Sequence, residues 1–205
     1  MYLPKQFDMP AFAPELMREN PFASLISNDD EGFPYVTHLP LHLEERNEEL
    51  YIIGHCARVN PHWKYLKARP GALITFMGPH AYMSPSVYPD LVRVPTWNYL
   101  TVHVKVLARL VDENELKDSI LKQLIADHES TYADQWRALP ESYTKPMLSA
   151  IVAFELKVLE IKSKVKLNQH RPEAHVRMHE IYSNGGDHEK SLAAWMRKLG
   201  LKISD

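Results

Sequence analysis

The sequence predicts a mainly β protein of the α+β class, an antiparallel barrel with peripheral helices. Five or six stretches have strand patterns, and few helices lie between them, which argues against a parallel sheet. Glycine accounts for only 7 of the 205 residues, and neither G-x-G-x-x-G nor a Walker-type loop occurs, so the common Gly-rich nucleotide folds are excluded. Closing an antiparallel sheet into a barrel removes its exposed edges.

Residues 14–27 have the pattern of a short helix, interrupted by Pro21, and residues 28–32 form a turn. Leucines alternate with polar residues over 35–43, which indicates a strand with one apolar face. A charged turn and the apolar residues 50–54 follow, so 35–54 is predicted to be a hairpin.

The next helix is predicted from Asn60 to Arg69, with Asn60 as its N-cap and Pro61 at its first position. A strand over 71–77 is expected to break at Gly78-Pro79 and continue extended through 80–88. Alternation over 98–110 gives the clearest strand of the chain.

An acidic start at 112–115 predicts a helix, followed by a connector over 127–142 and a last strand over 148–161. The basic segment 162–171 leads into helices over 172–182 and 187–199, the second closed by Gly200. We therefore expect a barrel domain over 1–162 and a basic, helical extension over 163–205 that packs on the barrel or on a dimer partner.

Composition narrows the function classes. The formal net charge of −2 gives no general attraction to nucleic acid or acidic membranes. Cys56 is the only cysteine, which excludes an internal disulfide and a Cys-rich zinc site and fits a reducing compartment. No run of 18 apolar residues and no signal-peptide pattern occur, so we expect a cytoplasmic protein without a membrane partner.

Residues 54–61 combine a strand end with a helix start. Free N–H groups at a helix N-terminus attract anions, and His55 and Arg58 would add charge-assisted hydrogen bonds to a phosphate. The alternative is a plain capped turn with an exposed arginine, and the residues alone favour it.

Residues 76–86 and 94–99 alternate aromatic, hydroxyl and amide side chains over a proline-stiffened frame, as a planar heteroaromatic ligand requires. An ordinary core with Tyr and Trp at its rim explains them equally well. The basic segment, with Lys164, Lys166 and Asn168, is either a phosphate clamp, a nucleic-acid patch or, more simply, a solvated turn. His175 and His179 have helical spacing but no third ligand, so no metal site is predicted.

Six blocks in order resemble the PaiB family of FMN-binding split-barrel proteins, which are often called negative transcriptional regulators. Two of them are Gly54-His55-Cys56-Ala57-Arg58-Val59-Asn60-Pro61 and Phe76-Met77-Gly78-Pro79-His80-Ala81-Tyr82-Met83-Ser84-Pro85-Ser86. The others are Met1-Tyr2-Leu3-Pro4 with Phe7, Thr37-His38-Leu39-Pro40-Leu41, Val94-Pro95-Thr96-Trp97-Asn98-Tyr99 and Lys166-Leu167-Asn168-Gln169-His170-Arg171. The sequence departs from the family at Val87, where a Trp is usual, and at Asn168 and His170.

The resemblance implies an antiparallel split β-barrel related to pyridoxamine 5′-phosphate oxidase. It also implies that this chain forms a homodimer and binds FMN at the interface between the subunits. It implies a phosphate near Arg58 and the helix that starts at Asn60. The residues it assigns to the cofactor are Thr37, His38, His55, Arg58, Asn60, Tyr82, Ser84, Trp97, Asn98, Lys166, Gln169 and Arg171.

The resemblance leaves three functions open. The first is a flavin-dependent oxidoreductase that takes electrons from a nicotinamide or acts on another small molecule. The second is a regulator that acts through protein or DNA, although 162–182 is the only candidate DNA surface. The third is a haem-binding split barrel with His80 or His103 as axial ligand. No catalytic residue is assigned.

Overall fold

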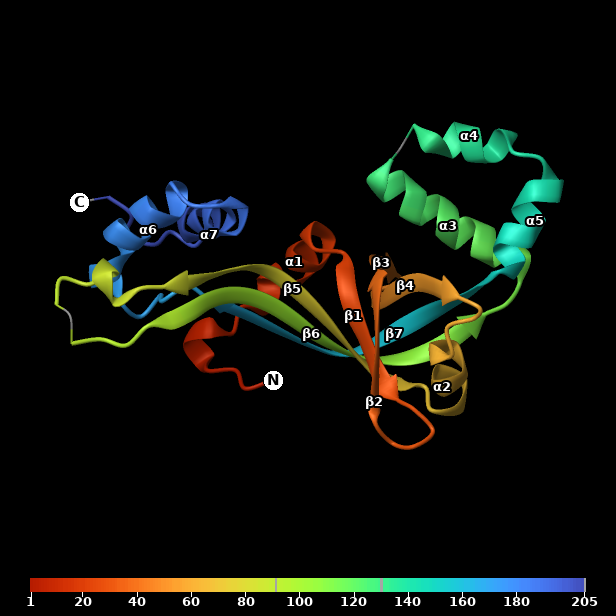
Figure 1. Ribbon diagram of the computed structural model, residues 1–205, viewed down its shortest axis with the longest axis horizontal. Helices are drawn as coiled ribbons and strands as arrows, with labels where there is room; N and C mark the ends of the chain where they lie inside the picture. Colours follow the sequence, from red (N-terminus) through yellow and green to blue (C-terminus); the bar gives the residue numbers. More distant parts are fainter. Residues whose placement is uncertain (91, 130, 205) are drawn as a thin grey trace. The chain divides into compact units, whose positions relative to one another are not determined.

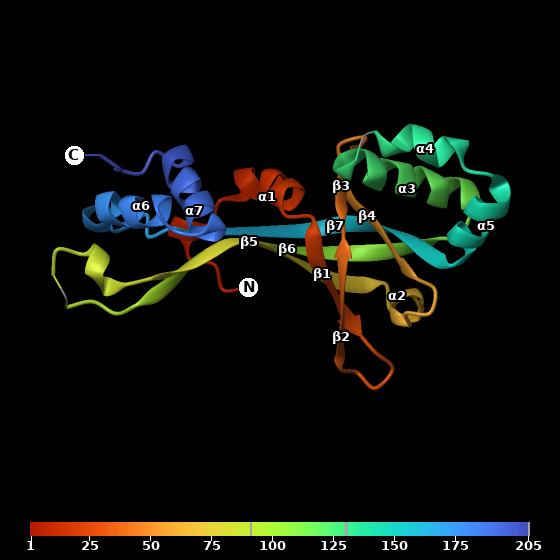
Figure 2. The ribbon, with the colours of Figure 1, turned by 45° about the horizontal axis from the view of Figure 1, so that its top comes forward.

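The computed structural model describes residues 1–90, 92–129 and 131–204. Its strands form one seven-stranded antiparallel sheet with the order β2-β1-β5-β6-β7-β4-β3, and helices lie at its periphery (Figures 1 and 2). This confirms the predicted mainly β class. The strands are β1 Phe22–Asn28, β2 Pro34–Pro40, β3 His42–Arg46, β4 Glu49–Ala57, β5 Gly71–Met83, β6 Thr96–Val111 and β7 Ile151–Lys166.

Seven α-helices and four short 3₁₀ turns accompany the strands in the described part of the chain. The helices are α1 Ala13–Glu19, α2 His62–Ala68, α3 Asn114–His128, α4 Tyr132–Ala138, α5 Glu141–Ser149, α6 His175–Ser183 and α7 Asp187–Lys198. The 3₁₀ turns are η1 Lys5–Phe7, η2 Pro10–Phe12, η3 Pro85–Val87 and η4 Pro172–Ala174. None of the described helices is long and apolar enough to cross a membrane.

The chain divides into two compact units. Unit 1 comprises Met1–Leu16, Met77–Val102 and Lys162–Asp205, and unit 2 comprises Met17–Phe76 and His103–Ile161. Strands β5, β6 and β7 each contribute residues to both units. The predicted C-terminal segment 163–205 thus shares a unit with the N-terminal residues and with the loop between β5 and β6.

Unit 2 contains the paired antiparallel strands β1–β2, β1–β5, β3–β4 and β4–β7. Helix α3 packs on this sheet through Ile120 and Leu124, which form one buried cluster with Ile53, Val111 and Ala153. Gly54 allows β4 to pass close to Leu41, because a Cβ at this position would lie 2.5 Å from a Leu41 methyl carbon. Burial of these apolar side chains supplies the main driving force for this packing.

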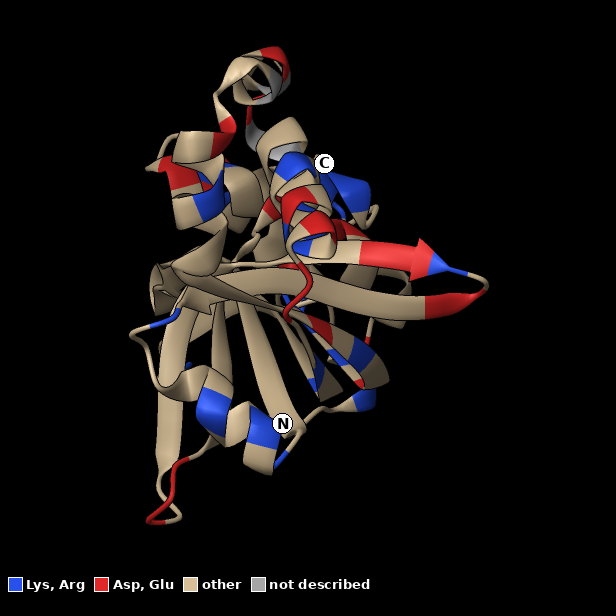
Figure 3. Cartoon of the chain, turned by 90° about the vertical axis from the view of Figure 1, so that its right-hand side faces the viewer, with Lys and Arg blue, Asp and Glu red and all other residues tan. Residues whose placement is uncertain are grey.

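Ion pairs lie across the outer part of the unit 2 sheet. Arg46 of β3 bonds to Glu44 and to Glu155 of β7, and Arg109 of β6 bonds to the same Glu155. Lys157 pairs with Glu49. Figure 3 shows the red and blue segments adjoining along β3 and its turn. Glu49 lies diagonal to Lys157, whose direct partner is Tyr51, and opposite charges on neighbouring strands stabilise their pairing.

Unit 1 is held together by helices α6 and α7. Met178 and Tyr182 of α6 and Trp195 of α7 are buried, and Phe12 meets the Trp195 ring edge-on at 5.2 Å. Gly200 has a φ of +63°, as expected for the glycine that ends α7.

The N-terminal half of the topology differs from the prediction. Residues 22–27, predicted as the end of a helix, belong to strand β1, because Pro21 ends the helical region and the burial of 23, 25 and 27 has a period of two. The predicted strand 35–43 is two strands, which separate at Pro40. As a result β2 pairs with β1, and only β3 forms a hairpin with β4.

Three other boundaries differ. Strand β5 continues through Gly78-Pro79 to Met83 instead of breaking there, and β7 extends to Lys166, so it includes half of the basic segment. Pro61, not Asn60, occupies the N-cap position of α2. The predicted connector 127–142 contains helix α4 and the start of α5, although it includes residue 130, which lies outside the described residues.

Candidate functional site

The residues predicted to bind a cofactor are divided between the two units. Unit 2 holds Thr37, His38, His55, Arg58 and Asn60, and unit 1 holds Tyr82, Ser84, Trp97, Asn98, Lys166, Gln169 and Arg171. Many polar atoms of both groups are bonded within the protein, and the groups differ in that unit 1 also exposes two large aromatic rings.

In unit 2, Thr37 and Asn60 belong to a hydrogen-bonded corner between β2 and α2. The Asn60 amide donates to Thr37 Oγ1 at 3.2 Å, and Thr37 Oγ1 lies 2.7 Å from His62 Nδ1. Asn60 Oδ1 accepts from the Tyr35 hydroxyl at 3.3 Å and from the His62 backbone N–H at 3.0 Å. Asn60 therefore caps α2 with its side chain, as the sequence predicts, but from one residue before the N-cap position.

His62 is the most buried member of this corner, with an exposed fraction of 1%. Burial lowers its pKa to about 4, so the imidazole is neutral near pH 7. The Tyr35 ring packs edge-on against it at 5.1 Å. Its Nε2 is buried and has no hydrogen-bond partner among the described residues. Sequence reasoning did not single out His62, although it directly follows the Asn60-Pro61 helix start.

The Arg58 guanidinium is bonded to the protein. Its Nε donates to the Ser149 carbonyl at 2.8 Å, and Nη2 donates to the Ile151 carbonyl and to the Asp112 carboxylate, each at 3.1 Å. Lys117 and then Arg58 hydrogen-bond to Asp112 and lower the pKa of that carboxyl. Arg58 thus links the end of β4 to the start of β7, and it has this structural role whether or not it contacts a ligand.

The two histidines of the unit 2 group differ in exposure. His38 is exposed on β2, and its Nδ1 lies 3.0 Å from Ser24 Oγ. His55 of β4 is half-buried, burial lowers its pKa, and its Nδ1 has no partner among the described residues. His55 lines a pocket of about 300 Å³ with Tyr132 and the apolar face of α3.

Unit 1 presents aromatic rings to solvent. Trp97 and Tyr82 remain 53% and 52% exposed, and their rings meet edge-on at 6.3 Å. His80 lies 6.0 Å from the Trp97 ring and 4.4 Å from the His188 ring of α7. This group provides an exposed surface suited to a flat, conjugated ligand.

Lys166 places a partly desolvated cation beside these rings. Its ammonium donates to Thr96 Oγ1 at 2.6 Å and to the Trp97 carbonyl at 2.8 Å. Burial, and then the neighbouring Lys164, lower its pKa. Both lysines lie over the Tyr99 ring, at 5.8 and 5.1 Å. Lys164 and Lys166 therefore belong to the end of strand β7 and are bonded within the protein, so this part of the basic segment is not a solvated turn.

The remaining unit 1 residues hold the local backbone. The Gln169 amide donates to the Val165 carbonyl and its oxygen accepts from the Leu167 N–H. Ser84 caps η3 by accepting from the Ser86 N–H. Asn98 is completely buried, and its amide donates to Tyr182 Oη at 2.9 Å. The Arg171 guanidinium comes no closer than 3.9 Å to Glu173, a weak contact.

The haem alternative rests on two histidines with different surroundings. His80 is exposed beside His188, whereas His103 of β6 is half-buried and burial lowers its pKa. Within the described residues, no group of three or more His, Cys, Asp or Glu is placed to hold a metal ion.

Comparison with known proteins identifies the family. Residues 1–160 match the family described as "Putative FMN-binding domain". The chain is 35% identical over 179 residues to the Bacillus subtilis protein named "Protease synthase and sporulation protein PAI 2", and the match covers 84% of each chain.

Two solved structures share the fold. One is described as the FAD and haem binding protein from Mycobacterium smegmatis, with a TM-score of 0.59 and 14% identity over 77% of this chain and 71% of that one. The other is a conserved hypothetical protein from Mycobacterium tuberculosis, with a TM-score of 0.58 and 12% identity over 80% and 90%. These likenesses agree with the split-barrel fold class. The sequence match over most of its length means that the chain belongs to the PaiB-type family of FMN-binding domains.

Proposed function

We propose that this protein binds FMN and uses it as the redox cofactor of an oxidoreductase. The exposed Tyr82 and Trp97 rings beside the Lys166 ammonium carry this proposal, in a chain whose family is defined by an FMN-binding domain. FMN would supply the electron transfer, and the protein would bind, orient and shield it.

The residues present fit the chemistry of FMN. A flat ring system requires aromatic walls, which Tyr82 and Trp97 offer, and a phosphate dianion requires cations, which Lys166 and Arg171 offer. In unit 2, the partners of Thr37 and Asn60 are already within the protein. We therefore propose that unit 1 supplies direct contacts to FMN, while Thr37, Asn60 and Arg58 hold the local backbone of unit 2.

We propose a homodimer as the functional form. Leu107 of β6 and Leu159 of β7 lie on neighbouring strands of unit 2 and are exposed, which leaves apolar side chains on a sheet face. The Lys105–Glu160 pair joins the same two strands. Sedimentation velocity tests this: we expect a single species of twice the chain mass, and a monomer at all concentrations would contradict it.

The visible spectrum tests the cofactor. The protein is incubated with excess FMN and desalted, and we expect flavin bands at about one flavin per chain. NADH and NADPH are then added under anaerobic conditions, and bleaching of the bands by either identifies the electron donor. A protein that retains flavin but is bleached by neither donor would contradict the oxidoreductase. A Soret band in the purified protein would favour haem instead.

A flavin-responsive regulator is the second candidate, favoured by the similarity to the protein named "Protease synthase and sporulation protein PAI 2". Burial argues against direct DNA binding through the basic segment. Lys164 is buried and donates to the Tyr2 carbonyl, and Lys166 is bonded to Thr96 and Trp97. We therefore expect no salt-sensitive DNA retardation in a mobility-shift assay, with or without FMN.

A further inference from the structure

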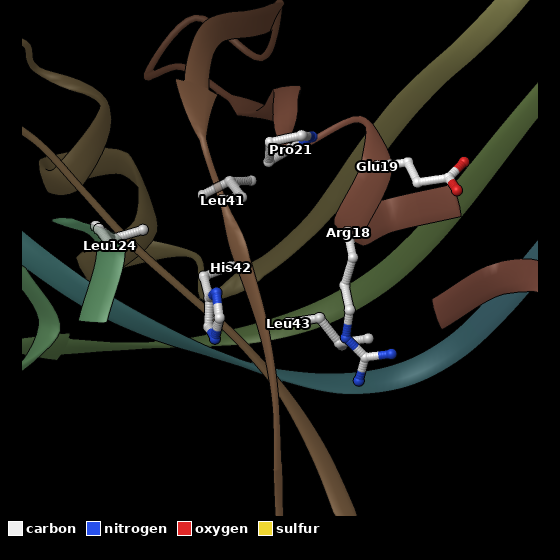
Figure 4. A pocket seen from close by; sticks show the side chains of 7 residues that line it. All are labelled: Arg18, Glu19, Pro21, Leu41, His42, Leu43 and Leu124. Atoms are coloured by element: carbon white, nitrogen blue, oxygen red, sulfur yellow. The ribbon is translucent and has the colours of Figure 1, made fainter. Parts of the chain in front are cut away.

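Unit 2 contains a pocket that shares no residue with the predicted cofactor set. Its volume is about 410 Å³, within the range of about 300–1,000 Å³ that is usual for small-molecule sites. Figure 4 shows the seven side chains that line it: Arg18, Glu19, Pro21, Leu41, His42, Leu43 and Leu124.

The floor of the pocket is apolar and firmly held. Leu41, in the junction between β2 and β3, and Leu43 of β3 are buried, and so is Leu124 of α3. The Leu41 N–H donates to the Pro21 carbonyl at 2.9 Å, which fixes the two segments to each other. Because these side chains already pack against the core, the floor is formed before any ligand arrives.

Arg18 gives the rim a single available cation. It is exposed at the end of α1, and no hydrogen bond or ion pair is found for it in the described part of the chain. Arg18 and Leu43 both line the pocket, and in Figure 4 the Glu19 carboxylate is directed away from Leu41 and Leu124. The Gln123 amide lies 3.2 Å from His42 Nε2 and holds that ring at the pocket wall.

We infer that this pocket binds a small apolar monocarboxylate. The carboxylate would take a bidentate pair of hydrogen bonds from the Arg18 guanidinium, a geometry that favours arginine over a point charge. The hydrocarbon body would lie on Leu41, Leu43 and Leu124. An uncharged analogue gains only the apolar contact, so the site selects the acid by charge complementarity.

This site is additional to the proposed flavin function and does not depend on it. A carboxylic acid bound here would be a second ligand of the protein, either a substrate or an effector. The test therefore compares flavin-free and flavin-loaded protein.

Calorimetric titration with 3-phenylpropanoate and with 3-phenylpropan-1-ol tests the assignment. We expect the acid to bind with a Kd of about 1 mM or tighter, as its size allows, and the alcohol at least tenfold more weakly. Arg18→Gln should weaken binding of the acid at least tenfold, and Arg18→Lys should weaken it less than Arg18→Gln does.

The matched control is Lys67→Gln, which removes another exposed positive charge of unit 2 and should leave the affinity unchanged. Circular dichroism of each variant confirms that it is folded. Absence of binding would overturn the assignment, as would equal affinities of the native protein and Arg18→Gln. Binding that FMN abolishes and Arg18→Gln leaves intact would place the acid at the flavin site and also overturn it.

Discussion

The two groups of predicted cofactor residues differ in whether they expose large aromatic rings. In unit 2, Arg58, Asn60 and Thr37 bond to carbonyls, a carboxylate and one another. In unit 1, Tyr82 and Trp97 leave half of their surface open. The same family motifs therefore include residues that hold the site and residues that can meet a ligand, and substitutions should separate the two kinds.

The largest expected effect comes from His62→Ala. The substitution removes a buried ring and leaves the Asn60 amide as the remaining partner of the Thr37 hydroxyl, so we expect a loss of about 3 kcal/mol in the free energy of unfolding. Urea denaturation measures it. The exposed His188→Ala in unit 1 is the control and should change stability by less than about 0.5 kcal/mol. Equal losses in both variants would remove the distinction between the units.

Arg58→Ala should lower stability by about 2 kcal/mol, because it removes charge-assisted hydrogen bonds to two main-chain carbonyls. We expect FMN affinity to fall at least tenfold with it. Flavin fluorescence titration and urea denaturation of the same variant measure the two effects. Unchanged FMN affinity would exclude Arg58 from the site and leave it a purely structural residue.

The pH dependence of stability provides a third test. Burial lowers the pKa of His62 to about 4 in the folded protein, whereas its pKa in the unfolded chain is about 6.5. Between these two pH values, the unfolded chain therefore binds a proton at His62 that the folded protein does not. The contribution of His62 is complete above pH 6.5 and is lost as the pH falls towards 4. We expect His62→Gln to reduce the loss of stability between pH 7 and pH 4.5 by about 1–2 kcal/mol. Identical pH profiles would show that His62 titrates normally.

Lys166→Met should lower FMN affinity with a smaller loss of stability than Arg58→Ala. It removes a partly desolvated cation whose pKa burial already lowers, so stability should change by less than about 1 kcal/mol. FMN affinity should fall about tenfold, because one charge-assisted contact to the phosphate is lost. Riboflavin has the same ring but no phosphate. If the variant loses as much affinity for riboflavin as for FMN, Lys166 acts on the ring and not on the phosphate.

The smallest effect is expected for Tyr82→Leu. The leucine keeps an apolar contact but removes the edge-on ring beside Trp97, so FMN affinity should fall a few-fold with no measurable change in stability. Flavin fluorescence titration of Tyr82→Phe, which keeps the ring, is the control and should resemble the native protein. A leucine variant with native affinity would exclude Tyr82 from the flavin wall.

Local patterns predicted the elements of the fold well. The alternation over 98–110 lies within strand β6, and the Gly200 stop coincides with the end of α7. Pairing was harder, because period-two alternation continues across the junction at Pro40 and does not show that the chain leaves one partner strand for another. Gly78-Pro79 was wrongly predicted to end a strand. Both residues can adopt the extended conformation, and a proline is tolerated in a strand where its position needs no backbone N–H donor.

Site residues were predictable as motifs but not as roles. The sequence shows Asn98 and Trp97 side by side, yet alternation along β6 buries the first against Tyr182 and exposes the second. His62 received no role, since a histidine after a helix cap gives no local indication of burial. The apolar pocket beside Arg18 draws residues from α1, the β2–β3 junction and α3, which only the tertiary fold brings together.

Cys56 gives the molecule a built-in reporter of strand β4. The thiol is buried, and burial raises its pKa to about 11, so in the native fold it is protonated and shielded from alkylating reagents. Reagent uptake by this thiol therefore measures how often β4 separates from its neighbours. Because Cys56 is the sole cysteine, a probe attached through a cysteine introduced at an exposed position would label that position alone.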